Sequence, residues 1–264
     1  MGRFLLIAGP CLLESKSLCE EVGCVLTRIG KKYPQMRLIF KASADKANRS
    51  SALSPRGLGI DGALAILADI RDQLNVEVTS DFHEPSQAKK FAKVCDVLQV
   101  PAFLCRQTDM LAAAADTGKA VSVKKGQFLS PWDMVNVVEK LRQFGAKEII
   151  QIERGTSFGY GNLVVDMRGL QIMAQNGCPV VYDVTHSLQL PGLGGRSTVG
   201  DRRYADTLAF AAIGAGVGGL FLETHPNPAA ALCDKETQLP LANLEQRIDK
   251  YMKLHAAVKD LMYA

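Results

Sequence analysis

The chain has 264 residues, of which 47% are hydrophobic and 22% are charged, and its formal net charge is +4 at pH 7. This length and composition suit one α/β barrel with a full hydrophobic core. Lysine and arginine are scattered along the chain instead of clustered, which argues against nucleic acid as a partner. No stretch approaches the roughly 20 apolar residues of a membrane-spanning helix, so we expect no membrane association.

The seven cysteines are odd in number and unevenly spaced, and we expect no secretory leader before them. They are Cys11, Cys19, Cys24, Cys95, Cys105, Cys178 and Cys233. Such a pattern is typical of free thiols in a reducing compartment. We therefore expect a cytoplasmic protein.

Short apolar runs rich in valine, isoleucine and leucine recur between longer amphipathic stretches. They cover residues 4–9, 38–43, 76–81, 97–102, 121–126, 149–154, 180–186 and 219–225. A run that is apolar on both faces is typical of a parallel strand covered by helices. The intervening stretches predict helices, as at residues 131–144, with Ser130 as N-cap, Pro131 at the first position and Gly145 as C-cap.

Eight such repeats without a linker predict a single (β/α)8 barrel over residues 1–264, in preference to an open doubly wound sheet. Polar residues stand late in nearly every run. They are Cys11, Lys41, Ser43, Asp81, His83, Gln99, Lys124, Lys125, Arg154, His186, Glu223 and His225. Catalytic residues of barrels project from the carboxyl ends of strands, so we expect an active site at that mouth, although strand ends near solvent are often polar for no functional reason.

Two groups of these residues predict chemistry. The cations Lys41, Lys46, Arg49, Lys124 and Arg154 would meet at one mouth, which favours a ligand that carries both phosphate and carboxylate. A thiol, an imidazole and two carboxylates would meet there too, and together they suit one divalent transition metal, with Zn, Fe, Mn and Co left open. The four are Cys11, His186, Glu223 and Asp234. Taken singly, Cys11 is more typical of a small buried apolar residue, and His186 of a hydrogen-bonded core histidine.

Eight longer segments carry a more specific signal. They are IAGPCLLES from Ile7, KASADKANRSS from Lys41, TSDFHEPSQA from Thr79, QVPAFLCRQTD from Gln99, VKKGQFLSP from Val123, ERGTSFGYGNLVVDM from Glu153, DVTHSLQLPG from Asp183 and LETHPNP from Leu222. Together they resemble the 3-deoxy-octulosonate 8-phosphate synthases, in that family's order, from Leu6 to about Leu244. Lys46-Ala47-Asn48-Arg49 follows this family, whereas the related heptulosonate synthases carry Lys-Pro-Arg-Thr there.

The resemblance implies condensation of phosphoenolpyruvate with arabinose 5-phosphate, for lipopolysaccharide (Kdo) biosynthesis. Within this resemblance, Cys11 implies the metal-dependent class, because the metal-independent class has Asn at this position. The resemblance also implies that the metal is bound by Cys11, His186, Glu223 and Asp234. The residues implied to hold phosphoenolpyruvate are Lys41, Ser43, Lys46, Gln99, Ala102, Lys124 and Arg154. Those implied to hold the sugar phosphate are Asn48, Arg49, Ser50 and Asp81.

Arg106 is implied to reach the sugar phosphate of a neighbouring subunit, and a homotetramer follows from that analogy. The residues expected to take part in the chemistry are Lys46, Asn48, Asp81, Lys124 and His186. For His83, assistance in proton transfer and a plain hydrogen bond to backbone remain open. A heptulosonate 7-phosphate synthase and a non-catalytic barrel that binds sugar phosphates are the alternative functions.

The chain departs from the family's pattern in the segment SALSPRGLGIDG and in the loop GGRSTVGDRR, which has Val199 in a usually glycine-rich stretch. Both segments are expected to be loops at the mouth. We also expect the amino-terminal hairpin beneath the barrel to be absent or truncated, because the first strand begins at Phe4.

Overall fold

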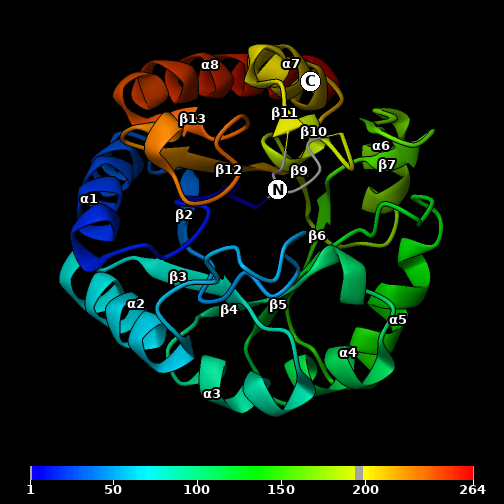
Figure 1. Cartoon of the computed structure of the whole chain (residues 1–264). Coiled ribbons are helices and arrows are strands. Elements are labelled where there is room, and N and C mark those ends of the chain that lie inside the picture. The colour runs from blue at the N-terminus through cyan, green and yellow to red at the C-terminus, as the bar shows by residue number, and fades with distance from the viewer. Residues whose placement is uncertain (1, 194–198, 264) are drawn as a thin grey trace.

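The protein folds as a closed barrel of eight parallel strands, seen in a computed structural model that describes residues 2–193 and 199–263 (Figure 1). The first strand pairs with both the second and the last, because Leu6 is in register with Leu38 on one side and Leu220 on the other. The barrel strands are β1 (Phe4–Gly9), β2 (Met36–Lys41), β3 (Glu77–Asp81), β4 (Val97–Val100), β5 (Ala120–Lys124), β6 (Ile149–Glu153), β9 (Val180–Asp183) and β12 (Gly219–His225).

Helices surround the barrel and bury its outer face (Figure 1). They are α1 (Lys16–Lys32), α2 (Ile60–Leu74), α3 (Ala88–Ala92), α4 (Thr108–Ala115), α5 (Met134–Gln143), α6 (Arg168–Ala174), α7 (Ala205–Gly214) and α8 (Leu244–Tyr263). The (β/α)8 prediction is therefore confirmed. None of the helices in the described part of the chain has the length and apolar character that crossing a membrane requires.

The strand predictions are right in place but often two or three residues too long at the carboxyl end. β9 ends at Asp183, where the apolar run predicted a strand as far as His186, which instead begins a short 3-10 turn. Likewise β4 ends at Val100 and β5 at Lys124. β12 differs, because it carries Glu223 and continues to His225 as predicted.

Five shorter strands decorate the loops and were not predicted, because two or three residues show no periodicity. They are β7 (Thr156–Phe158), β8 (Asn162–Val164), β10 (Gln189–Leu190), β11 (Val199–Gly200) and β13 (Leu239–Pro240). β10 pairs with β11 in the loop after the seventh barrel strand. Residues 194–198 of the loop GGRSTVGDRR lie outside the described residues, and Val199 begins β11.

The helix predicted over residues 131–144 is present, but its regular part begins at Met134 after one turn. The turn is held by reciprocal hydrogen bonds, since the Ser130 hydroxyl accepts from the amide of Asp133 and the Asp133 carboxylate accepts from the amide of Ser130. These bonds satisfy amides at the start of the helix. Gly145, with φ of 87°, follows the last turn in the left-handed region.

An ion-pair cluster lies inside the amino-terminal end of the barrel. Ile39 packs inside the barrel, and Arg37 lies two residues earlier on the same strand, so its side chain points to the same interior. Its guanidinium donates to Glu77 in β3 at 2.6 and 2.7 Å and also contacts Glu148 just before β6. This cluster spans the barrel at the end opposite the predicted site.

Candidate active site

The strand period brings polar side chains into the barrel mouth. Ile39, Val97, Ile152, Val181 and Phe221 pack in the barrel interior. Because alternate residues of a strand face the same side, the residues two positions later continue these rows toward the mouth. They are Lys41, Gln99, Arg154, Asp183 and Glu223.

A cavity of about 240 Å³ opens at this mouth. Its lining includes nearly every residue predicted to bind substrate. These are Lys41, Ser43, Lys46, Asn48, Arg49, Ser50, Asp81, Gln99, Ala102, Lys124 and Arg154, joined by His186 and Asp234 of the predicted metal site. Arg106 is the exception, because it is exposed and absent from this lining.

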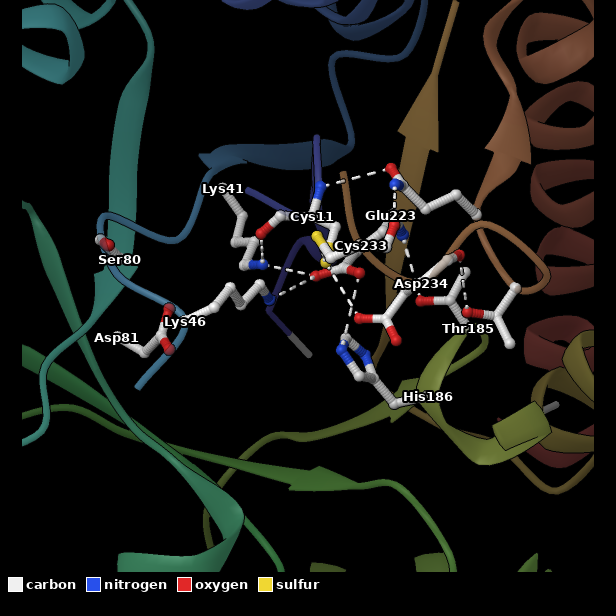
Figure 2. A network of polar contacts seen from close by, with 12 residues as sticks. Cys11, Lys41, Lys46, Ser80, Asp81, Thr185, His186, Glu223, Cys233 and Asp234 are labelled. Carbon is white, nitrogen blue, oxygen red and sulfur yellow. Dashed lines mark hydrogen bonds and ion pairs between the residues drawn. The ribbon is translucent and has the colours of Figure 1, made fainter. Parts of the chain in front are cut away.

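Glu223 is surrounded by positive groups at the end of β12 (Figure 2). Lys41 forms a buried ion pair with its Oε1 at 2.5 Å and also donates to the carbonyl of Cys11 at 2.9 Å. Lys46 lies 4.0 Å from the same oxygen. Burial alone would raise the pKa of the Glu223 carboxyl, but the neighbouring His186, Lys41 and Lys46 side chains hold that pKa well below its usual value.

A second buried pair joins β5 and β9. Lys124 Nζ donates to Asp183 Oδ2 at 2.7 Å and lies 3.7 Å from the centre of the Phe221 ring. Burial lowers the pKa of Lys124 despite this carboxylate partner. The carboxylates of Glu223 and Asp183 therefore balance part of the positive charge of the lysines, which the sequence analysis had expected a ligand to balance.

Unpartnered polar atoms indicate what the cavity still lacks. Among the described residues, buried side-chain atoms without a hydrogen-bond partner include Arg154 Nη1, Ser43 Oγ and Gln99 Oε1. Buried polar groups are rarely left unsatisfied, so their grouping in one cavity points to a polar ligand. The guanidinium is also the only one of the three that carries charge, which favours an anion next to Arg154.

The four predicted metal ligands come together in two overlapping groups. His186, Glu223 and Asp234 offer ligand atoms within 4.8 Å of one another, and so do Cys11, Cys233 and Asp234. Cys11 Sγ lies 3.0 Å from Asp234 Oδ2, and His186 Nε2 lies 3.6 Å from Glu223 Oε2. Figure 2 shows these side chains converging from separate loops and strands.

The residues present fit a divalent transition metal. Glu223 Oε2 is buried without a hydrogen-bond partner, although it faces the imidazole of His186. Thiol, imidazole and carboxylate ligands together are the set that Zn, Fe, Mn and Co accept to differing degrees. An ion bound among these groups would give the unpartnered oxygen a partner, which agrees with the donor chemistry.

The backbone at Asp234 is unusual. Its φ is 47°, in the left-handed region, and its carbonyl accepts from the amides of Thr237 and Gln238 in a tight turn. Asp tolerates this region better than most residues. The Gln238 side chain then connects the turn to the segment just after β1, because it accepts from the amide of Cys11 and donates to the carbonyl of Cys233.

The part of the cavity next to the loop after β2 is more open. Asn48 is exposed and Arg49 is half-buried on the loop after β2, and Arg49 donates to the carbonyl of Leu232 at 3.1 Å. His83 lies deeper, with Nε2 at 3.0 Å from the carbonyl of Asp45 and 3.2 Å from Asp81 Oδ2. The backbone hydrogen bond considered for His83 is therefore present. The ring also contacts Asp81, one of the residues predicted to bind the sugar.

The sequence is similar to those of known proteins over nearly its full length. Residues 2–260 match the model of the DAHP synthetase I family. The chain belongs to this family. It is 52% identical over 256 residues to the 2-dehydro-3-deoxyphosphooctonate aldolase of Desulfotalea psychrophila, covering 97% of this chain and 91% of the relative. The equally named protein of Fusobacterium nucleatum is 50% identical over 261 residues, covering 97% and 92%.

Three residues at the mouth of this DAHP synthetase I family member were not among the predicted site residues. Asp183 contacts both Lys124 and His186, Gln189 lies between Arg154 and Asp234, and Cys233 Sγ lies 2.6 Å from Cys11 Sγ. Asp183 and Gln189 lie within the segment DVTHSLQLPG, and Cys233 directly precedes Asp234. Sequence order gave no sign that they would contact groups more than 30 residues away.

Proposed function

We propose that this chain condenses phosphoenolpyruvate with D-arabinose 5-phosphate and water, giving 3-deoxy-D-manno-octulosonate 8-phosphate and phosphate for Kdo biosynthesis. The observation that carries this proposal is the unpartnered Arg154 guanidinium nitrogen, buried in the same cavity as Lys41 and Lys124. Relatives that share about half of the residues bear the name of an enzyme of this chemistry.

Phosphoenolpyruvate carries a carboxylate and a phosphate on a small enol. The lysines Lys41, Lys46 and Lys124 neutralise these groups, and the Arg154 fork orients one of them. Ser43, Gln99 and the backbone at Ala102 supply hydrogen bonds. Both anionic ends are thereby held while C3 of the enol stays free to react.

The sugar phosphate lies toward the exposed rim. Arg49 and Ser50 hold its phosphate, where the loop is open to solvent, and Asn48 and Asp81 bond its hydroxyl groups. Burial would raise the pKa of Asp81, but the hydrogen bond from His83 and the nearby lysines keep that pKa well below its usual value. Asp81 is thus an ionised acceptor for sugar hydroxyls.

In the reaction, C3 of the enol bonds to the aldehyde carbon, the oxygen of water adds at C2, and the bond from C2 to the phosphate oxygen breaks. The two protons of the water end on the former aldehyde oxygen and on the released phosphate. Burial would lower the pKa of Lys46, but Cys11 and Glu223 outweigh it and keep the pKa well above its usual value. Lys46 therefore stays positive and stabilises developing oxyanion charge.

Cys11, His186, Glu223 and Asp234 would hold one divalent metal, with Zn, Fe, Mn and Co as candidates. When bound, such an ion supplies Lewis acidity toward oxygen atoms. His186 is oriented for its role by Asp183, which lies 2.9 Å from Nδ1 and leaves Nε2 toward Glu223. The free state of all seven cysteines supports a reducing compartment such as the cytoplasm.

A homotetramer is the assembly that we propose, with Arg106 reaching a neighbouring sugar phosphate. Support comes from large apolar side chains exposed near the mouth, because such groups often mark contact surfaces. They are Phe103, Phe128, Trp132 and Phe158. Sedimentation equilibrium tests the assembly, and a monomer at micromolar concentration would exclude it.

Release of inorganic phosphate from phosphoenolpyruvate tests the reaction, with arabinose 5-phosphate or erythrose 4-phosphate as the aldose. We expect turnover with the five-carbon sugar, loss of turnover after chelation and recovery on addition of Mn²⁺. Turnover that resists chelation would overturn the proposed metal site but leave the proposed synthase activity standing. No phosphate release with either sugar would remove the enzyme assignment.

A second candidate is a 3-deoxy-D-arabino-heptulosonate 7-phosphate synthase, which the description of the matching family favours. The same reaction would then use erythrose 4-phosphate. Asn48 lies in the cavity lining at the position where the heptulosonate synthases are expected to have arginine. Preference for the four-carbon sugar in the phosphate assay would establish this alternative.

A further inference from the structure

Gln189 bridges the two halves of the candidate site. It is the first residue of β10, directly after the turn that carries His186, and its side chain lines the cavity. Its Oε1 accepts from Arg154 Nη2 at 2.6 Å, and its Nε2 donates to Asp234 Oδ1 at 2.9 Å. One amide therefore contacts a proposed anion-binding residue and a proposed metal ligand.

The chemistry of the two partners fixes the orientation of this amide. A guanidinium only donates hydrogen bonds, and an ionised carboxylate only accepts them. The oxygen of Gln189 must therefore face Arg154, and its nitrogen must face Asp234. A side chain with two acceptors or two donors, or an apolar one, could not satisfy both contacts.

Gln189 contacts one terminal nitrogen of Arg154 and one carboxylate oxygen of Asp234, so the other nitrogen and the other oxygen can contact ligands. Arg154 keeps Nη1 buried and without a partner, while Nη2 is bound to Gln189. Asp234 keeps Oδ2, which faces Cys11 Sγ at 3.0 Å, while Oδ1 is bound to Gln189. Movement of either free group must be accommodated by the same amide.

We infer that Gln189 is a positioning residue that couples binding of the enol phosphate at Arg154 to binding of the divalent metal at Asp234. This inference rests on the proposed function and names a link between its two ligands. An anion that fixes Arg154 also fixes the amide, and the amide then holds the Asp234 carboxylate in one orientation. Since coupling of binding is reciprocal, the metal strengthens binding of the anion by the same factor.

The test measures affinity and does not depend on turnover. The dissociation constant of Mn²⁺ is determined by calorimetry without and with saturating phosphoenolpyruvate, on the full chain. For the unmodified protein we expect phosphoenolpyruvate to tighten Mn²⁺ binding by about 5-fold or more, the usual scale of coupling between two sites. In Gln189→Met, which has similar length but no amide, we expect that ratio to fall toward one.

A matched control and a second variant complete the experiment. Gln127 lines the same cavity without a hydrogen bond to Arg154 or Asp234, so Gln127→Met should keep the coupling ratio of the unmodified protein. Gln189→Asn retains the amide but is one methylene shorter, so it cannot reach both partners and should lose the ratio as Met does. This variant decides the question if the Met variant fails to fold.

The outcomes separate the two proposals. A ratio unchanged in Gln189→Asn or in a folded Gln189→Met overturns the coupling role, and so does a ratio of one in the unmodified protein that still binds both ligands. An unmodified protein that binds neither Mn²⁺ nor phosphoenolpyruvate overturns the proposed function instead. Loss of the ratio in the Gln189 variants, with retention in Gln127→Met, establishes the bridge.

Discussion

The Nδ1 atom of His186 lies 2.9 Å from Oδ2 of Asp183, and the same carboxylate oxygen accepts from Lys124 Nζ at 2.7 Å. Asp183 also accepts from the backbone amide of His186 at 2.9 Å, so the residue is fixed from several directions. This arrangement gives the proton of the neutral imidazole to Nδ1 and leaves the Nε2 lone pair toward Glu223. A carboxylate in this position is typical of histidines that bind metals.

We expect Asp183→Asn to weaken metal binding by about 10- to 100-fold, the usual effect of removing a carboxylate that orients a ligand. The amide can present its own donor to Nδ1, which would turn the ring toward the wrong tautomer. Titration of the metal-free protein with Mn²⁺ measures the effect. Asp166→Asn, which alters an exposed carboxylate paired with Arg168, should bind as the unmodified protein does. Equal affinity in both variants would show that Asp183 does not orient the ligand.

Replacing Arg154 with lysine tests the proposed anion site. Lysine keeps the positive charge, but it cannot contact Gln189 and an anion in the fixed geometry of the guanidinium. Loss of one charged hydrogen bond costs about 1.5 to 3 kcal/mol, so we expect KM for phosphoenolpyruvate to rise by roughly 10- to 100-fold. Steady-state phosphate release at saturating sugar gives this constant. A KM within twofold of the original value would place the anion elsewhere.

The pair of His83 and Asp81 should make stability depend on pH. Burial would lower the pKa of His83, but the hydrogen bond and charge of Asp81 outweigh it and raise that pKa above the ordinary value of 6.5. A histidine whose pKa is raised on folding stabilises fully below its unfolded-state pKa. That contribution is lost as pH rises from about 6.5 through the folded-state pKa.

Thermal unfolding of the unmodified protein and of His83→Gln, measured at intervals from acid to alkaline pH, checks this sign. The melting temperature of the unmodified protein should exceed that of the variant most clearly at acid pH, and the difference should shrink as pH rises. Asp81, whose pKa is lowered, stays ionised above about pH 5 and adds no slope of its own there. A difference that grows with pH would contradict the assignment.

Much of the fold followed from periodicity in the sequence. The run at residues 219–225 coincides with β12, because it begins with apolar residues and is buried throughout. The run at residues 180–186 overshoots β9, because Val184 and Thr185 are as buried as strand residues although they lie in a turn. Buried strand residues and buried turn residues have the same apolar composition, so only the backbone hydrogen bonds show where the strand ends.

The candidate site was predictable where a strand delivers the residue and less so where a loop does. Lys41 and Glu223 follow from the two-residue period of their strands. Gln189 and Cys233 depend on how the loops after β9 and β12 fold back over the mouth, which no local pattern encodes. Family resemblance supplied roles for conspicuous motif residues, but it did not supply the contacts that hold them in place.

The ion-pair cluster at the opposite end of the barrel should affect stability and leave catalysis intact. In Arg37→Met, Glu77 and Glu148 lose the cation that they share, and both contacts are only partly exposed to solvent. Removing one partner of such a group costs about 1 to 3 kcal/mol. For a chain of this size, a melting temperature lower by roughly 2 to 4 °C for each kcal/mol is expected.

Adding Glu77→Gln and Glu148→Gln to Arg37→Met should recover part of the loss, because the two uncompensated carboxylates are then removed. The kcat of each variant should match that of the unmodified protein, since Arg37 lies at the amino-terminal end of β2 and Lys41 at its mouth end. A single variant that melts with the unmodified protein would show that the cluster adds nothing to stability. A triple variant less stable than the single one would show instead that the carboxylates stabilise this end through contacts other than those with Arg37.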